Sequence, residues 1–359
     1  MRVLIVGPFP PVINGVTICN EYLKKTFGSK YRIECINTDS GIISTKQGDS
    51  LSLKKVFRFI SIYLSLYKIL RTDVVYATPG QTFWGLVKYI PFSWLCILTG
   101  KKYILHFHGG YTAKAYTNLN GIKKTIFGSI IRKASSVICL SESLASEMKS
   151  AIPEASVDTV ENFYDPELTA GILPYKESDR LRLLYLSNLM KEKGILELLD
   201  AAIQIDNKGI DFELHIAGKS EQSIQNDIDS RIQLLGDKVV YHGNLDLTRK
   251  KELLQKTNVF VLPTYYTMEG QPISIIEAYV TGHIVITTDQ GGIMDIAGYP
   301  SVIIVNKQNV TDLADKLVYA KEHLNELMRS AVQTQLDTQK RFDNATFVTS
   351  IESIWLRYS

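Results

Sequence analysis

Two glutamates near residue 270 are the residues of this chain whose types and spacing best suit chemistry. Glu269 follows the apolar run 259–262 across a short loop, and Glu277 lies eight residues further on. Pro272, between them, is a residue that helix starts accept readily, so we expect a helix with Glu277 more than a turn inside it. A carboxylate among apolar side chains needs partners. Ribose or sugar hydroxyls would supply them, which predicts a site for a polyhydroxylated ligand.

The start of the same helix is suited to an anion. The first N–H groups of a helix have no partners within it, and the helix dipole attracts negative charge there. The alternative is a capping glutamate with a structural ion pair. The residues expected to line a ligand here are Gly270, Gln271, Pro272 and Ile273, together with the two glutamates.

A loop further up the chain contains a lysine in an unusual place. Lys193 lies between the predicted strand 181–186 and a helix that runs through Ala202. A cation at a helix start opposes the helix dipole, so an anionic ligand would give Lys193 a role. Asn188, in the same loop, is a second predicted contact. A solvated surface lysine is the alternative, and it fits Lys191 better.

The first strand leads into a turn that contains glycines. Gly7 ends the strand and Gly15 opens the next predicted helix, an arrangement in which backbone N–H groups can approach a diphosphate. The spacing does not match G-x-G-x-x-G, which counts against an NAD-dependent oxidoreductase. An Asn-Gly turn with no ligand is the alternative.

A histidine follows another strand of the first half. The predicted strand 103–107 runs into His108 and two glycines, at the carboxyl edge where open α/β sheets collect ligands. His108 could donate a hydrogen bond to a sugar hydroxyl, or it could be a buried structural histidine.

Short β-branched runs alternate with amphipathic segments through both halves of the chain, which predicts right-handed βαβ units and parallel sheets. The alternation restarts near residue 178. We therefore expect an α/β fold of two Rossmann-like, doubly wound domains that face each other across a cleft. The first would span 1–170, the second 175–344, and a terminal helix at 345–359 would pack back on the first.

A predicted helix over 54–68 has a broad apolar face and a narrow polar stripe. Packing on the sheet with one edge in water explains it, and docking on a membrane surface is the alternative.

Charge is distributed unevenly along the chain. The formal net charge is +3, but residues 1–165 hold 20 basic and 11 acidic side chains, so the first half is basic and the rest acidic. A basic half suits an anionic membrane surface or a phosphate-bearing acceptor. Nucleic acid is not expected, because no basic run with interleaved aromatic residues occurs.

Cysteine spacing and hydropathy limit the class of protein further. The four cysteines form no C-x-x-C pair and are expected to be reduced core residues rather than metal ligands. No apolar run suits a signal peptide or a membrane span. We expect a cytoplasmic protein, with peripheral contact at the inner face of the membrane as an option.

Together these residues resemble the GT-B glycosyltransferases of family 4, which are retaining and metal-independent. Four motifs carry the resemblance: Pro-Pro-x-x-x-Gly at 10–15, His-Gly-Gly at 108–110, Lys-Gly at 193–194, and the glutamate pair. Asn188 stands where the family usually has arginine, and Gln271 stands in place of phenylalanine. The resemblance implies that Glu277 holds the ribose, Glu269 the transferred sugar and Lys193 the diphosphate, with His108 beside the reacting sugar.

The implied activity is a hexosyl-type transfer from a nucleotide-sugar donor to an acceptor hydroxyl, with no cofactor and no metal ion. The expected acceptor is a glycan or a lipid-linked saccharide of surface-polysaccharide synthesis. Two alternatives remain open: a nucleotide-sugar epimerase or hydrolase, and a non-catalytic GT-B subunit that binds a partner enzyme.

Overall fold

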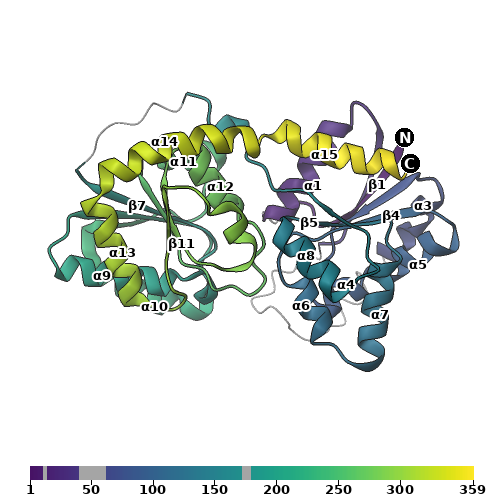
Figure 1. The fold of residues 1–359 in the computed structure, drawn as a ribbon, viewed down its shortest axis with the longest axis horizontal. Coiled ribbons are helices and arrows are strands. Elements are labelled where there is room, and N and C mark those ends of the chain that lie inside the picture. Colours follow the sequence, from purple (N-terminus) through teal and green to yellow (C-terminus); the bar gives the residue numbers. More distant parts are fainter. Residues whose placement is uncertain (11–13, 40–61, 172–178) are drawn as a thin grey trace. The chain divides into compact units, whose positions relative to one another are not determined.

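The computed structural model describes residues 1–10, 14–39, 62–171 and 179–359 (Figure 1). The chain divides into two compact units. The first comprises Met1–Glu161 and Ala345–Ser359, and the second comprises Asn162–Asn344.

The first unit is built on a six-stranded parallel sheet with the order β2-β1-β3-β4-β5-β6. Every residue of β3 and β5 is buried, as expected for strands covered by helices on both faces. The strands are β1 (Arg2–Gly7), β2 (Arg32–Asn37), β3 (Val74–Ala77), β4 (Lys102–His106), β5 (Ser136–Cys139) and β6 (Val157–Thr159).

The helices of this unit lie between the strands along the chain. They are α1 (Gly15–Phe27), the 3-10 turn η1 (Leu64–Leu66), α3 (Tyr67–Leu70), α4 (Phe83–Val87), α5 (Ile90–Leu98), α6 (Thr112–Thr117), α7 (Gly121–Arg132) and α8 (Glu142–Ala151). Of the helix predicted over 54–68, residues 54–61 lie outside the described part. The described end consists of η1 and α3 rather than one continuous helix.

The terminal helix α15 (Asn344–Arg357) packs on the first unit. The Trp355 side chain is fully buried, with its ring 4.7 Å from that of Phe27 and 5.5 Å from that of Tyr76. Near the end of the helix, the Arg357 guanidinium pairs with the Asp158 carboxylate at 2.9 Å. An amphipathic segment far from the first unit in sequence thus completes its core.

The second unit is also a six-stranded parallel sheet, with the order β12-β11-β10-β7-β8-β9. The chain winds outward from β7 to one edge and then returns to β10, so the order reverses between these two neighbours. The strands are β7 (Leu181–Leu186), β8 (Phe212–Ala217), β9 (Val239–Tyr241), β10 (Val259–Leu262), β11 (Ile284–Thr287) and β12 (Val302–Ile304).

The second unit has longer α-helices and several 3-10 turns. The α-helices are α9 (Ile195–Asn207), α10 (Gln225–Leu235), α11 (Leu247–Lys256), α12 (Ile273–Val280), α13 (Val310–Glu322) and α14 (Leu324–Arg341). The 3-10 turns are η2 (Pro166–Leu168), η3 (Lys191–Lys193), η4 (Gln222–Ile224), η5 (Gly236–Lys238) and η6 (Gly291–Ile296).

The division between the units falls at Glu161/Asn162, earlier than the boundary predicted between 170 and 175. Tyr164 and Leu168 already belong to the apolar core of the second unit. The Tyr164 N–H also donates to the carbonyl of Phe342, at 3.3 Å. The described residues from Asn162 to Gly171 are therefore part of the second unit.

Candidate active site

The strand order of the second unit indicates where a ligand would bind. Open α/β sheets bind ligands outside the carboxyl ends of the two strands between which the order reverses. Here those strands are β7 and β10. The loop after β7 contains Lys193, and the loop after β10 contains Glu269.

Lys193 and Glu269 form an ion pair. The Lys193 Nζ lies 2.6 Å from Glu269 Oε2, and the two side chains are only 14% and 8% exposed. The lysine ammonium also lies 5.0 Å from the centre of the Tyr266 ring. The fold therefore pairs a largely buried cation with a largely buried carboxylate that lies 76 residues away in sequence.

Backbone contacts hold these two loops together. The Tyr265 N–H donates to the Glu192 carbonyl at 2.8 Å. Gly194 has a positive φ of 78°, and a Cβ there would lie 2.3 Å from the Pro263 carbonyl oxygen. Only glycine allows this approach without strain. The Lys-Gly pair is thus explained by geometry: glycine lets the lysine loop lie against the end of β10.

Thr264 supports the carboxylate of Glu269. Its buried hydroxyl lies 3.1 Å from Glu269 Oε2 and accepts from the Tyr266 N–H at 3.2 Å. On the other side of the loop, the Gly292 N–H donates to the Gly270 carbonyl at 3.0 Å. Lys193 and Thr264 therefore hold the Glu269 carboxylate, and a backbone hydrogen bond holds the next residue of its loop.

Glu277 has a different partner. Its Oε1 lies 2.5 Å from Lys250 Nζ of α11, with side chains 7% and 20% exposed. Glu277 is four residues into α12, about 6 Å from the helix start along the axis at the usual rise. The two glutamates thus form two separate ion pairs, and Glu277 is not joined to Lys193 in this structure.

The start of α12 has no side-chain cap. The helix begins at Ile273, and Pro272 is its N-cap rather than its first residue. The side-chain oxygen of Gln271 accepts from the Asn162 N–H at 2.7 Å, and the Asn162 amide donates to the Gln271 carbonyl at 2.7 Å. Gln271, predicted as a donor contact, is buried in this structural link, so its amide oxygen is already engaged.

Asn188 is exposed near the start of the loop that follows β7. The hydroxyl of Tyr185 donates to the Asn188 carbonyl at 3.1 Å. Burial and the nearby Glu269 carboxylate raise the pKa of Tyr185 well above its usual value, so this hydroxyl stays protonated and can donate. The buried Tyr185 hydroxyl therefore holds the backbone of this loop, while Asn188 itself is exposed to water.

In the first unit, His108 follows β4 and stacks on His106, with ring centres 4.0 Å apart. The His106 Nδ1 shares a 2.5 Å hydrogen bond with the Tyr76 hydroxyl. Burial lowers the pKa of His108 to about 4, so the ring is neutral at pH 7. The Nε2 atoms of both histidines have no partner among the described residues.

The donor atoms of Cys19, His106 and His108 lie within 4.8 Å of one another. Burial raises the pKa of the Cys19 thiol, which therefore carries its proton at pH 7. All four cysteines are free thiols, and Cys35 is only partly buried.

Gly15 opens α1 behind Asn14, whose side chain accepts from the N–H groups of Val16 and Thr17 at 3.0 Å. The capping asparagine thus takes up two of the N–H groups at this helix start. Residues 11–13 of the Pro-Pro-x-x-x-Gly motif lie outside the described part.

Two contributors escaped prediction. Thr264 lies just after β10, in the same loop as the predicted Glu269, so its position held a signal for it. Lys250 gave none, because three basic residues stand together at 249–251 and only the helix register shows which one meets Glu277.

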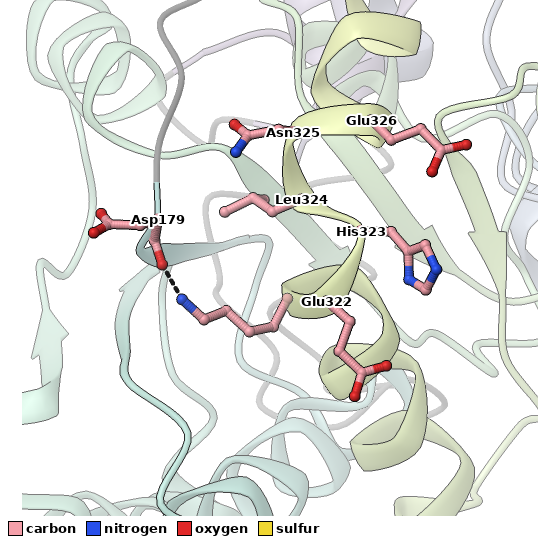
Figure 2. A pocket seen from close by; sticks show the side chains of 7 residues that line it. Asp179, Glu322, His323, Leu324, Asn325 and Glu326 are labelled. Carbon is pink, nitrogen blue, oxygen red and sulfur yellow. Dashed lines mark hydrogen bonds between the residues drawn. The ribbon is translucent and has the colours of Figure 1, made fainter.

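A hollow elsewhere in the second unit lies at the junction of α13 and α14 (Figure 2). It is lined by Asp179 and residues 321–326, and the Lys321 ammonium donates to the Asp179 carbonyl. It contains none of the predicted site residues. Among the described residues, no helix is long and apolar enough to cross a membrane.

Parts of the sequence match proteins of known class. Residues 174–335 match the family model "Glycosyl transferases group 1". A Campylobacter jejuni N,N'-diacetylbacillosaminyl-diphospho-undecaprenol alpha-1,3-N-acetylgalactosaminyltransferase is 27% identical over 137 residues, which is 37% of this chain and 34% of that protein. A Bacillus subtilis protein named "Putative teichuronic acid biosynthesis glycosyltransferase TuaC" is 25% identical over 171 residues, which is 45% of this chain and 40% of that protein.

Solved structures show the same fold over nearly the whole chain. HepE of Anabaena, in complex with UDP and glucose, superposes with a TM-score of 0.75 at 15% identity, covering 98% of each chain. A glycosyltransferase of Rickettsia africae gives 0.77 at 17% identity, covering 99% of this chain and 98% of the other. The two parallel sheets thus have the GT-B fold. The family model and the curated relatives support a glycosyltransferase enzyme, although the matched segments span less than half of those relatives.

Proposed function

We propose that this protein is a retaining glycosyltransferase of GT-B family 4 that moves a sugar from a nucleotide-sugar donor to an acceptor hydroxyl. The observation that carries the proposal is the Lys193–Glu269 ion pair at the carboxyl ends of β7 and β10. It lies inside the segment that matches the group 1 transferase model. The Anabaena structure with UDP and glucose is of the same fold, which supports this choice of donor class.

The proposed roles divide the donor among three groups. Lys193 binds the diphosphate, the Glu269 carboxylate accepts hydrogen bonds from the transferred sugar, and Glu277 accepts them from the ribose. The uncapped N–H groups at the start of α12 add to the anion site. In the free protein, each glutamate is neutralised by a lysine, so a donor replaces existing partners rather than meeting bare charges.

The chemistry follows from where negative charge develops. As the bond from the anomeric carbon to the diphosphate breaks, charge grows on the phosphate oxygen, and a fixed cation and helix dipole stabilise it. The acceptor oxygen then bonds to the anomeric carbon on the same face, and its proton passes to the departing phosphate. Glu269 is held by Lys193 and Thr264, which suits an acceptor of hydrogen bonds better than a covalent nucleophile.

His108 is assigned to the acceptor side of the reaction. A neutral ring can donate one hydrogen bond to a sugar hydroxyl without adding charge. Transfer on this scheme needs no metal ion, so activity is expected to persist in EDTA.

The proposed acceptor is a glycan or a lipid-linked saccharide of surface-polysaccharide synthesis. The names of two relatives support this class: the Campylobacter protein is an N-acetylgalactosaminyltransferase named for a diphospho-undecaprenol-linked saccharide, and the Bacillus protein is a putative glycosyltransferase of teichuronic acid biosynthesis. A lipid-linked acceptor would bring the protein into contact with an anionic membrane.

The proposal is tested in two steps. A thermal-shift screen of nucleotide sugars (UDP-glucose, UDP-N-acetylglucosamine, GDP-mannose) should show one class that raises the melting temperature by mass action. Incubation of that donor with saccharide acceptors should yield a product with the donor's anomeric configuration. Epimerised or hydrolysed donor without transfer, or an inverted product, would contradict the proposal.

A further inference from the structure

The first unit contains a long stretch without acidic residues. Between Asp73 and Glu142 there is no aspartate or glutamate over 68 residues, whereas there are eight lysines and arginines. The structure describes the whole stretch, which includes α4, α5, α6 and α7. A charge of one sign over so large a part of a domain attracts an anionic surface.

Helix α5 is apolar on the side that faces water as well as on the side that faces the core. Phe92 and Cys96 are buried, whereas the exposed fractions of Trp94, Ile97 and Leu98 are 58%, 39% and 81%. Positions 94, 97 and 98 share one face, because residues three and four apart are neighbours on a helix. A helix that is apolar all round normally lies in a protein core or in lipid. In the described part of the chain, the face of α5 that bears Trp94, Ile97 and Leu98 is exposed.

Other helical elements of the first unit also bear exposed apolar side chains. Both η1 and α3 contact α5, and Leu64 and Leu70 on them are 76% and 55% exposed. Helix α4 contacts α7, and each bears one further exposed apolar side chain. We call the set the basic–apolar surface; its apolar members are Leu64, Leu70, Trp84, Trp94, Ile97, Leu98 and Ile122 (Figure 1 labels α3, α4, α5 and α7).

Cations are interleaved with these apolar side chains. The Lys123 ammonium lies 5.7 Å from the Phe83 ring centre and 6.0 Å from that of Trp84. The Arg71 guanidinium lies 5.9 Å from the ring of Tyr67. The lysine next to the exposed Trp84 matches the layered chemistry of a membrane interface, where headgroup charge lies above the acyl boundary.

We propose that the basic–apolar surface docks on an anionic lipid bilayer. Trp84, Trp94 and Leu98 would enter the headgroup–acyl boundary, and the lysines around them would bind anionic headgroups. A soluble anionic polymer would pair with the lysines but would leave the tryptophans and leucines in water. This inference assigns a surface to the membrane contact of the proposed function. It rests on the proposed function for the biological role of that contact, whereas the contact itself is argued from the exposed side chains.

The tryptophans themselves provide a probe. Trp84 and Trp94 are exposed and the third tryptophan, Trp355, is buried, so a change in fluorescence on binding reports the surface. The full chain would be titrated with vesicles of phosphatidylcholine alone and with vesicles that contain phosphatidylglycerol. We expect a blue shift and co-sedimentation with the anionic vesicles, which weaken as salt screens the lysines. Neither donor nor acceptor is present, so the result does not depend on transferase activity.

Matched variants distinguish binding through this surface from nonspecific binding to vesicles. Trp94→Ser/Leu98→Ser is expected to weaken binding to anionic vesicles at least about tenfold, since it removes two inserted side chains. The control is Leu234→Ser/Leu336→Ser in the second unit, where the replaced side chains are 72% and 50% exposed. It should bind like the unchanged protein. Because all four positions are exposed, circular dichroism should show both variants folded.

Three results would overturn the proposal. One is the absence of vesicle binding, and the second is equal binding by the surface variant and its control. The third is equal affinity for soluble dextran sulfate with no fluorescence shift on vesicles, which would identify a polymer site.

Discussion

At the scale of single residues, two buried ion pairs define the proposed donor site. Lys193 with Glu269, and Lys250 with Glu277, are all at most 20% exposed. Removing one member of a buried pair leaves the other charge without compensation, which usually costs more than the pair itself contributes. Alanine substitution at these positions therefore tests stability and ligand binding together, and the two effects must be separated.

A double-mutant cycle separates them. Glu269→Ala and Lys193→Met singly should each lower the free energy of unfolding by roughly 2–4 kcal/mol, and the double variant by clearly less than their sum. Denaturant unfolding measures all three. The same cycle on Lys208 and Asp315, a pair more than half exposed, should show coupling near zero. Additive losses at 193 and 269 would mean that the ion pair does not form in solution.

The conservative variant tests the diphosphate role. Lys193→Gln keeps a side chain that can donate to Glu269 but removes the positive charge. Donor affinity should fall about tenfold or more, the usual effect of losing a charge-assisted hydrogen bond. Calorimetric titration with the donor found by screening measures it, and unchanged affinity would remove Lys193 from the site.

At the scale of elements, glycines decide how closely the site loops approach. Gly291 has a φ of 57°, and a Cβ on it would lie 2.2 Å from the Glu269 carbonyl oxygen. Alanine there must push the Glu269 loop away. Nothing lies within 4 Å of a Cβ at Gly298, which makes that position a matched control.

Gly291→Ala is therefore expected to destabilise the protein by about 1–3 kcal/mol and to reduce transfer strongly, whereas Gly298→Ala should do neither. Thermal unfolding and initial transfer rates check the pair. Full activity in Gly291→Ala would show that the position of Glu269 is not critical.

The elements themselves were largely predictable from the sequence. Alternation of β-branched runs and amphipathic segments predicted two parallel sheets, and the fold confirms them. Glu269 was predictable because it follows a buried strand before a helix start, and Lys193 because a cation at a helix start opposes the helix dipole. What escaped prediction depends on register and on distant contacts: which of residues 249–251 meets Glu277, and that Gln271 binds Asn162. The division between the units lies before the predicted bounds because Tyr164 and Leu168 join a core that is assembled from later segments.

At the scale of the whole molecule, histidine burial links stability to pH. Burial lowers the pKa of five of the six histidines: His106, His108, His215, His242 and His283. A histidine with a lowered pKa binds fewer protons folded than unfolded, so its contribution is complete above pH 6.5 and is lost as the pH falls. The protein should therefore lose stability steadily on acidification from pH 7 to pH 5.

His283 offers a single-site check. Its pKa is lowered to about 4 by complete burial, and both ring nitrogens are hydrogen-bonded by the hydroxyls of Thr257 and Thr281. At pH 5 the unfolded histidine is protonated and the folded one is not, which lowers the free energy of unfolding by roughly 2 kcal/mol. His283→Gln should lower stability at pH 7 yet reduce its decline toward pH 5, as measured by urea unfolding at both values. An unchanged decline would assign the pH dependence to other groups.

The central claim is that the β7–β10 end of the second unit binds the donor. Its most direct test is to measure how tightly the Glu277→Gln variant binds the donor identified by the thermal-shift screen. This variant removes a charge while keeping the shape of the side chain. Calorimetry should show affinity lowered about tenfold to a hundredfold relative to the unchanged protein, with vesicle binding by the first unit intact. Equal donor affinity in a folded Glu277→Gln protein would contradict the account.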